Sequence, residues 1–166
     1  MLRIRSFRLS DLPSVVRIFQ DSFDKYELTG LNTQQIYRLL ALRFRYEKYL
    51  DRIKKCVFKR SLKYIFTNRF DILILIAEIE GKVVGATFAV NVLDELWSLN
   101  QIAVHRNFRG RGIGTQLTKE VIALVKDRGG RKIILNVRPD NFAAVKLYKD
   151  LGFLVYDEIH SMELDL

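Results

Sequence analysis

The chain has 166 residues, of which 49% are hydrophobic and 28% charged, with a net charge of +9. These values are typical of one globular domain with a single core. The lone cysteine, Cys56, excludes an internal disulfide framework and fits a reducing compartment. The longest apolar run, residues 72–77, is too short to span a bilayer, and early arginines interrupt the start where a signal peptide needs an apolar core. We therefore expect a cytoplasmic protein of one domain, residues 1–166, with no membrane partner.

The first elements along the chain are predicted to be a strand and a helix. Residues 2–7 alternate apolar and basic side chains, which indicates a half-buried strand. Ser10 is a candidate N-cap for a helix that begins near Leu12, with Pro13 in its first turn. Apolar residues then recur at three- and four-residue intervals up to Phe23, as on the buried face of a helix.

The next segment, residues 31–69, is helical in pattern and strongly basic. No glycine or proline interrupts it, so one long helix or, in preference, two consecutive helices are predicted. Between residues 38 and 69 there are eleven Lys and Arg residues against two acidic ones, which accounts for the whole net charge. A solvated outer helix face, a site for an acidic partner, and a ribosomal or nucleic-acid surface all explain this charge. The sequence leaves these alternatives open.

The second half of the chain is predicted to alternate strands with two helices. Residues 70–80, 83–90 and 96–104 indicate three strands of a meander, with a first turn at Gly81-Lys82. A glycine-rich turn then opens a helix over residues 113–125. Residues 133–137 form an apolar strand, as expected for burial on both faces. A short helix over 141–150 and closing strands over 153–157 and 162–166 complete the chain.

The glycine-rich turn has the sequence Arg109-Gly110-Arg111-Gly112-Ile113-Gly114. Glycines allow a ligand to approach the backbone, and the free N–H groups at a helix start favour an anion, so this order predicts a site for a phosphate-bearing ligand. A Walker loop is excluded because no Gly-Lys-Ser/Thr follows, and a dinucleotide fingerprint is excluded because Thr115 replaces its third glycine. The alternative is a tight connection that binds nothing.

Two motifs resemble the GCN5-related N-acetyltransferases (GNAT). Arg109, Gly112 and Gly114 match the pattern Gln/Arg-x-x-Gly-x-Gly/Ala of that family. The residues that match its second pattern, N-x-x-A-x-x-L-Y-x-x-x-G-F, are Asn141, Ala144, Leu147, Tyr148, Gly152 and Phe153. Around residues 102–114 the chain is nearest in motif to the enzymes that acetylate the amino-terminal alanine of ribosomal proteins.

The resemblance implies an α/β fold with a mixed, mostly antiparallel central sheet flanked by helices, and an enlarged helical region over residues 31–69. It also implies acetyl-CoA as the cosubstrate. In that case backbone amides bind its pyrophosphate, the end of the preceding strand pairs with its pantetheine arm, and Tyr148 contacts it and protonates the departing thiolate. Asn141 would bond to the pantetheine arm or cap its helix. The cofactor-binding residues so implied are Ile102, Ala103, Val104, Arg109, Gly110, Arg111, Gly112, Ile113, Gly114, Asn141 and Tyr148.

The general base is not defined by a motif. The amino-terminal acetyltransferases that the chain resembles place a glutamate where Asn136 stands, and an amide cannot accept the proton. Glu95 is the best carboxylate candidate, with plain surface charge as the alternative, and a water relay through Asn100 or Asn136 is a third option. Two histidines, His105 and His160, and one cysteine lack metal-ligand spacing, so no metal site is predicted.

Two functions follow from these patterns. The first is an acetyl-CoA-dependent N-acetyltransferase that acts on a primary amine of a protein or small molecule by direct attack in a ternary complex. The second is a basic RNA- or ribosome-associated protein that retains a non-catalytic CoA pocket. For the enzyme, the basic segment offers an acidic or ribosomal docking surface or a contact for the 3′-phosphate of CoA. Either a monomer or a homodimer is compatible with the sequence.

Overall fold

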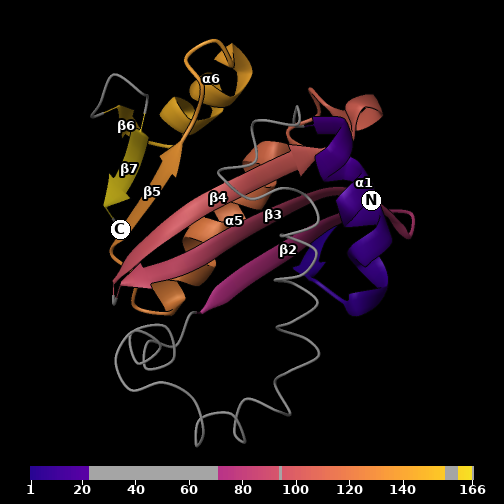
Figure 1. Ribbon diagram of the computed structural model, residues 1–166, viewed down its shortest axis with the longest axis horizontal. Helices are drawn as coiled ribbons and strands as arrows, with labels where there is room; N and C mark the ends of the chain where they lie inside the picture. Colours follow the sequence, from indigo (N-terminus) through magenta and orange to yellow (C-terminus); the bar gives the residue numbers. More distant parts are fainter. Residues whose placement is uncertain (23–70, 94, 156–160, 166) are drawn as a thin grey trace, which may run out of the picture.

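The computed structural model describes residues 1–22, 71–93, 95–155 and 161–165 (Figure 1). Seven strands of these residues form one sheet in the order β1-β2-β3-β4-β5-β7-β6. The strands are β1 (Leu2–Ser6), β2 (Ile72–Ile79), β3 (Lys82–Leu93), β4 (Leu96–Val104), β5 (Lys132–Asn136), β6 (Leu154–Val155) and β7 (Ser161–Asp165). The helices are α1 (Leu12–Ser22), α5 (Ile113–Asp127) and α6 (Phe142–Asp150), with 3₁₀ turns at η1 (Leu9–Asp11) and η2 (Arg106–Phe108).

The sheet is covered by α1 on one face and by α5 on the other, as Figure 1 shows. Val15, Ile18 and Phe19 of α1 pack with buried residues of β2, β3 and β4. The buried face of α5 includes Leu117, Val121 and Val125, which pack with Leu73, Leu75 and Trp97 of the sheet. The four-residue spacing of these α5 residues agrees with the helix predicted from apolar periodicity.

The strands β4 and β5 run parallel and pair only at their beginnings. Their register extends from Leu96 opposite Lys132 to Ser98 opposite Ile134. α5 is the crossover helix between them, as a parallel pair requires. β4 continues to Val104 without β5 beside it, so the second half of β4 has an open edge. The other strand pairs that the structure describes are antiparallel.

A bulge at Asn100 divides β4 into two halves. Leu99 lies opposite Ala89 and Gln101 opposite Phe88, so Asn100 is the extra residue. Side chains of a strand alternate between its faces, and one extra residue reverses that alternation. Leu99 therefore packs on the α5 side, whereas Ala103 packs on the α1 side. After the bulge it is Ile102 that points to the α5 side.

The amino-terminal strand and helix are joined by ion pairs. Arg5 donates to both carboxylate oxygens of Asp11, at 2.7 and 2.8 Å, and to Glu78 of β2 at 2.8 Å. Asp11 also accepts the backbone N–H of Arg8 at 2.7 Å. The prediction that Ser10 caps the first helix is wrong, because the helical turn already begins at Leu9 and Ser10 lies inside it.

The predicted element order agrees with the structure wherever residues are described, with small shifts of the boundaries. The first hairpin turn is Glu80-Gly81 and not the predicted Gly81-Lys82. Glu80 and Gly81 have positive φ, at 51° and 76°, as a two-residue hairpin turn requires. The predicted strand over 153–157 is described as Leu154–Val155. The predicted helices over 31–69 lie outside the described residues. No described helix is long and apolar enough to cross a bilayer.

Candidate active site

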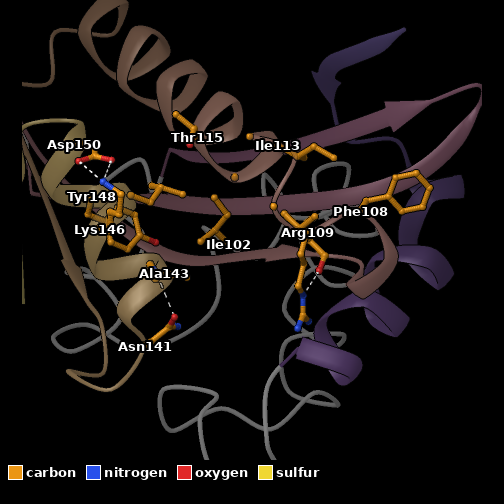
Figure 2. A pocket seen from close by; sticks show the side chains of 16 residues that line it. Ile102, Phe108, Arg109, Ile113, Thr115, Asn141, Ala143, Lys146, Tyr148 and Asp150 are labelled. Carbon is orange, nitrogen blue, oxygen red and sulfur yellow. Dashed lines mark hydrogen bonds and ion pairs between the residues drawn. The ribbon is translucent and has the colours of Figure 1, made fainter.

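A cavity of about 410 Å³ lies where the open half of β4, the first turn of α5 and α6 meet (Figure 2). The predicted cofactor-binding residues that line it are Ile102, Val104, Arg109, Gly110, Gly112, Ile113, Gly114, Asn141 and Tyr148. The structure therefore brings together both motifs, which are separated in the sequence by α5 and β5. It adds lining residues that were not among the predicted cofactor-binding residues: Phe108, Thr115, Ala143, Ala144, Lys146, Leu147 and Asp150.

The backbone of β4 presents free groups to this cavity. The N–H of His105 donates to the carbonyl of Val84 at 2.9 Å, which fixes the hydrogen-bonding side of the β3–β4 pair. In an antiparallel pair, successive residues direct their N–H and C=O groups alternately toward and away from the partner. Ile102 and Val104 therefore direct theirs away from β3, to the side that β5 has left. An extended ligand can pair with this edge as a strand would.

The start of α5 supplies donors at the same place. Gly110 and Gly112 both have left-handed backbones, with φ of 72° and 74°, which few other residues adopt without strain. The N–H of Gln116 is bonded to the carbonyl of Gly112 at 3.0 Å, so the N–H groups before it have no partner within the helix. Gly112 provides no side-chain cap, and the first turn of α5 contains no acidic residue. These amides are available to an anion.

The third glycine of the motif has a different role. A Cβ on Gly114 would lie 3.1 Å from Cδ1 of Leu147, a residue of α6. The absence of a side chain thus lets α6 approach the first turn of α5. Because both helices line the cavity, this contact sets its width between them.

Tyr148 projects from α6 toward the cavity (Figure 2). Its side chain is 95% buried and packs edge-on against Phe153, with ring centres 5.5 Å apart. Burial disfavours the charged tyrosinate and raises the pKa of Tyr148 well above its ordinary value near 10. At neutral pH the hydroxyl is therefore a proton donor and not a base.

Asn141 caps α6. Its side-chain oxygen accepts the backbone N–H of Ala144 at 3.2 Å, while the residue also lines the cavity. The capping alternative considered for this residue is therefore confirmed. An exposed amide nitrogen remains on the same side chain, which leaves room for a second contact with a ligand.

Neither arginine of the turn points at the α5 donors. Arg109 bends away from Ile113, toward α1 (Figure 2), where its Nε donates to the carbonyl of Val104 at 2.9 Å and its Nη2 to Ser22 Oγ at 3.1 Å. The guanidinium of Arg111 lies over the ring of Phe108, 5.2 Å from its centre. Arg111 is exposed and does not line the cavity. The donors that this turn offers to an anion are therefore backbone amides.

Besides Arg111, two further predicted site residues lie elsewhere. Ala103 is buried on the α1 side of the sheet and its backbone faces β3, because the alternation described above places Ile102 and Val104 at the open edge instead. Glu95 precedes β4 at its opposite end and pairs with Arg131 at 3.7 Å, with more than half of its side chain exposed. Seven residues of extended strand, about 23 Å, separate it from Ile102. The structure does not bring Glu95 to the cavity.

No base is evident among the described residues of the cavity. Among the described lining residues, Asp150 carries a carboxylate, and this carboxylate pairs with Lys146 at 3.1 Å. Asn100 at the bulge and Asn136 at the end of β5 are exposed and do not line the cavity. Within the same described ranges no group of three His, Cys, Asp or Glu residues is placed to hold a metal. The basic segment 38–69, Cys56 and His160 lie outside the described residues.

The additional lining residues of α6 carry a signal that sequence reasoning did not use. Residues 143, 144, 147 and 148 recur at helical spacing, as do Lys146 and Asp150, so a helix that turns one face to the cavity brings them all to it.

The sequence model of the acetyltransferase (GNAT) family matches residues 33–153. The chain belongs to this family. The family resemblance of the two motifs is thereby confirmed, and with it the prediction of a GNAT acetyltransferase. The match includes both motifs and the described elements from β2 to α6.

Sequence relatives align over parts of this GNAT chain. N-alpha-acetyltransferase 30 of Schizosaccharomyces pombe is 36% identical over 64 residues, which are 39% of this chain and 43% of that protein. The ribosomal protein bS18-alanine N-acetyltransferase of Salmonella typhimurium is 43% identical over 70 residues, 41% of this chain and 47% of that protein. The chain thus spans less than half the length of these two relatives.

Solved structures match over the whole chain. The PaiA N-acetyltransferase of Thermoplasma acidophilum, in complex with coenzyme A, has a TM-score of 0.68 and 21% identity over 100% of this chain and 99% of that one. A GNAT acetyltransferase of Brucella melitensis, in complex with acetyl-CoA, has a TM-score of 0.65 and 22% identity over 100% and 88%. These likenesses confirm the predicted mixed α/β fold of the family.

Proposed function

We propose that this GNAT chain is an acetyl-CoA-dependent N-acetyltransferase that transfers an acetyl group to a primary amine by direct attack in a ternary complex. The observation that carries the proposal is the meeting of the open edge of β4 with the unpaired amides of α5 at one cavity. Coenzyme A combines an extended chain of two amides with a diphosphate, and these two surfaces match those two parts.

In this arrangement the diphosphate accepts hydrogen bonds from the N–H groups of Gly112, Ile113, Gly114 and Thr115. The pantetheine arm pairs with Ile102 and the N–H of Val104, since the Val104 carbonyl already accepts a bond from Arg109. The thioester then lies between β4 and α6. A strand N–H at this edge can donate to the thioester oxygen and stabilise the negative charge that develops there.

The reaction begins when the neutral amine attacks the thioester carbonyl carbon. A C–N bond forms, the tetrahedral intermediate collapses, and the C–S bond breaks with its electron pair on sulfur. Tyr148 gives its hydroxyl proton to the departing thiolate, a role supported by its place at the cavity and its raised pKa. The amine releases a proton to water, which restores Tyr148 through solvent. Glu95 has no part in this scheme.

The acceptor is proposed only by class, as an amine of a peptide or a small molecule. Two relatives carry names that specify acetylation of an amino terminus, which favours testing peptides first. We also infer that the chain forms one domain, because a single sheet contains strands from both ends of the described sequence.

The test combines calorimetry with an assay of thiol release. The full chain is titrated with coenzyme A and then incubated with acetyl-CoA and either an alanine-starting tripeptide or Nα-acetyl-lysine. We expect saturable coenzyme binding and thiol release that requires the amine. A folded chain that shows no association with coenzyme A contradicts the proposal.

A further inference from the structure

The side chain of Arg109 links two parts of the molecule that are 87 residues apart in sequence. Its Nε donates to the last carbonyl of β4, at Val104, and its Nη2 donates to the hydroxyl of Ser22 in α1. Because Arg109 also lines the cavity, Ser22 lies near the margin of that cavity. Figure 2 shows the guanidinium on the side of α1 and away from the start of α5.

We infer that Arg109 is a positioning residue for the acceptor side of the reaction and contributes little to holding the diphosphate. The inference rests on the proposed function. It follows from where the two hydrogen bonds go: one fixes the strand edge that carries the thioester, and the other fixes α1 against that edge. Neither is directed at the amides of Gly112 and Ile113, where the diphosphate would bind.

The position of these hydrogen bonds also explains why Arg109 acts on the acceptor side of the cavity and not on the coenzyme side. The coenzyme occupies the space bounded by the first turn of α5 and by α6, so an acceptor amine would arrive from the side of β4 that the described residues leave open. Ser22 is the residue of α1 that Arg109 holds at this side. A shift of α1 relative to Val104 would change the path of the amine to the thioester while leaving the α5 amides in place.

The hydrogen bond of Arg109 to the Val104 carbonyl also restricts how the pantetheine arm pairs with β4. Since Val104 accepts from Arg109, its carbonyl is not available to an amide of the pantetheine arm, and pairing is concentrated on Ile102. A freed carbonyl would offer an additional acceptor and allow the arm to slide along the edge. Precise placement of a reacting carbon depends on a single register of this kind.

The experiment compares Arg109→Met, Arg109→Lys, Ser22→Ala and the double variant Arg109→Met/Ser22→Ala, each in the full chain. Arg106→Met is the matched control, because it removes an exposed arginine from the same turn that does not line the cavity. Circular dichroism melting checks that each variant folds. Calorimetry gives the Kd for coenzyme A, and thiol release gives kcat/KM for the alanine-starting tripeptide and for Nα-acetyl-lysine.

We expect Arg109→Met to lower kcat/KM for the amine about tenfold, as for the loss of a charged hydrogen bond, with the coenzyme Kd changed less than about twofold. Ser22→Ala lowers it less, and the double variant is no worse than Arg109→Met, since both remove one shared contact. Arg109→Lys, which retains one donor, falls between Arg109→Met and the unmodified chain. Arg106→Met leaves both quantities unchanged.

Several results would overturn the inference. One is a coenzyme Kd that weakens in Arg109→Met as much as kcat/KM falls, which would assign Arg109 to the diphosphate. Another is a double variant whose loss of kcat/KM equals the product of the losses in Arg109→Met and Ser22→Ala, because independent effects combine in this way. An unmodified chain that binds coenzyme A but acetylates neither amine also counts against it. An unmodified chain that fails to bind coenzyme A contradicts the proposed function itself, so the two failures are distinguishable.

Discussion

Gly112 and Gly129 flank α5 with almost the same left-handed backbone, at φ of 74° and 79°. A Cβ atom on either glycine would meet no other atom within 4 Å. Alanine therefore costs each position backbone strain of the same order, about 1–2 kcal/mol, without a steric clash. Gly112 lines the cavity, whereas Gly129 follows the far end of the helix. The pair separates the effect of backbone strain from an effect on the ligand site.

The first prediction uses this pair. Both Gly112→Ala and Gly129→Ala should lower the free energy of unfolding in urea by about 1 kcal/mol. Gly112→Ala should in addition weaken coenzyme A binding about tenfold, because the amides at the start of α5 no longer converge on one anion. Calorimetry measures the affinity. Equal affinities of the two variants would contradict an anion site at this turn.

The second prediction concerns Tyr148. Replacement by Phe keeps the packing against Phe153 and removes the proton donor, so turnover should fall about 100-fold while the coenzyme Kd stays within about twofold. Initial rates of thiol release and calorimetry provide the two quantities. Unchanged turnover would exclude Tyr148 as the acid.

The third prediction concerns the pH dependence of turnover. Burial raises the pKa of Tyr148, so its hydroxyl keeps its proton through the pH at which an ordinary tyrosine, with a pKa near 10, loses it. The rate profile of the unmodified chain should therefore show no loss of turnover from this group up to about pH 10. A decline centred near pH 8–9 that vanishes in Tyr148→Phe would contradict this protonation state.

The fourth prediction concerns the ion pair of Arg5 and Asp11. Asp11→Asn should reduce the free energy of unfolding by about 2–3 kcal/mol at pH 7, because it leaves a buried guanidinium with one partner fewer. Asp140→Asn is the control, since its pair with Arg138 is largely exposed and should contribute little to stability. Urea unfolding measures both losses.

The same ion pair has a defined pH window. The hydrogen bond from Arg5 lowers the pKa of Asp11 below its unfolded value of about 3.9. Its contribution is therefore fully present above that value and is lost as the pH falls through the lower folded pKa. The stability gap between the unmodified chain and Asp11→Asn should be constant from pH 6 to 8 and shrink below about pH 4. A stability gap that widens as the pH falls would contradict a lowered pKa of Asp11.

The fifth prediction concerns Arg111. Its guanidinium lies over Phe108 and outside the cavity lining, so Arg111→Ala should change the coenzyme Kd less than about threefold and leave its salt dependence nearly unaltered. Titrations at low and high salt test this. A tenfold weakening that disappears at high salt would show that the guanidinium reaches the phosphates.

Much of the described fold was predictable because its patterns are local. The apolar spacing of Leu117, Val121 and Val125 defines a helix face, and the position of that helix between two strands predicts a crossover. The glycines of the turn and the spacing of Asn141 and Tyr148 predicted two halves of one site. The structure brings them to one cavity.

The errors occurred where tertiary geometry decides. Ala103 was grouped with Ile102 because a run of consecutive residues does not show which edge of a strand each backbone group faces. Arg109 and Arg111 were included among the cofactor-binding residues, but side chains of this length can reach partners far away in the sequence, as Arg109 reaches Ser22. Glu95 was chosen by residue type, and its distance from the cavity depends on the length and direction of β4.

Because Asn100 is an extra residue in β4, the number of residues in this strand matters more for its shape than the identity of the residue at position 100. Deletion of this one residue would leave Ile102 and Val104 on the α5 side, because Leu99 and Gln101 already lie opposite consecutive residues of β3, but it would remove the local bend that a bulge gives to its strand. Substitution of the exposed Asn100 side chain keeps the extra residue, and with it the bend. Family members that share this architecture should therefore vary in identity at this position yet keep the count of residues between Trp97 and Val104.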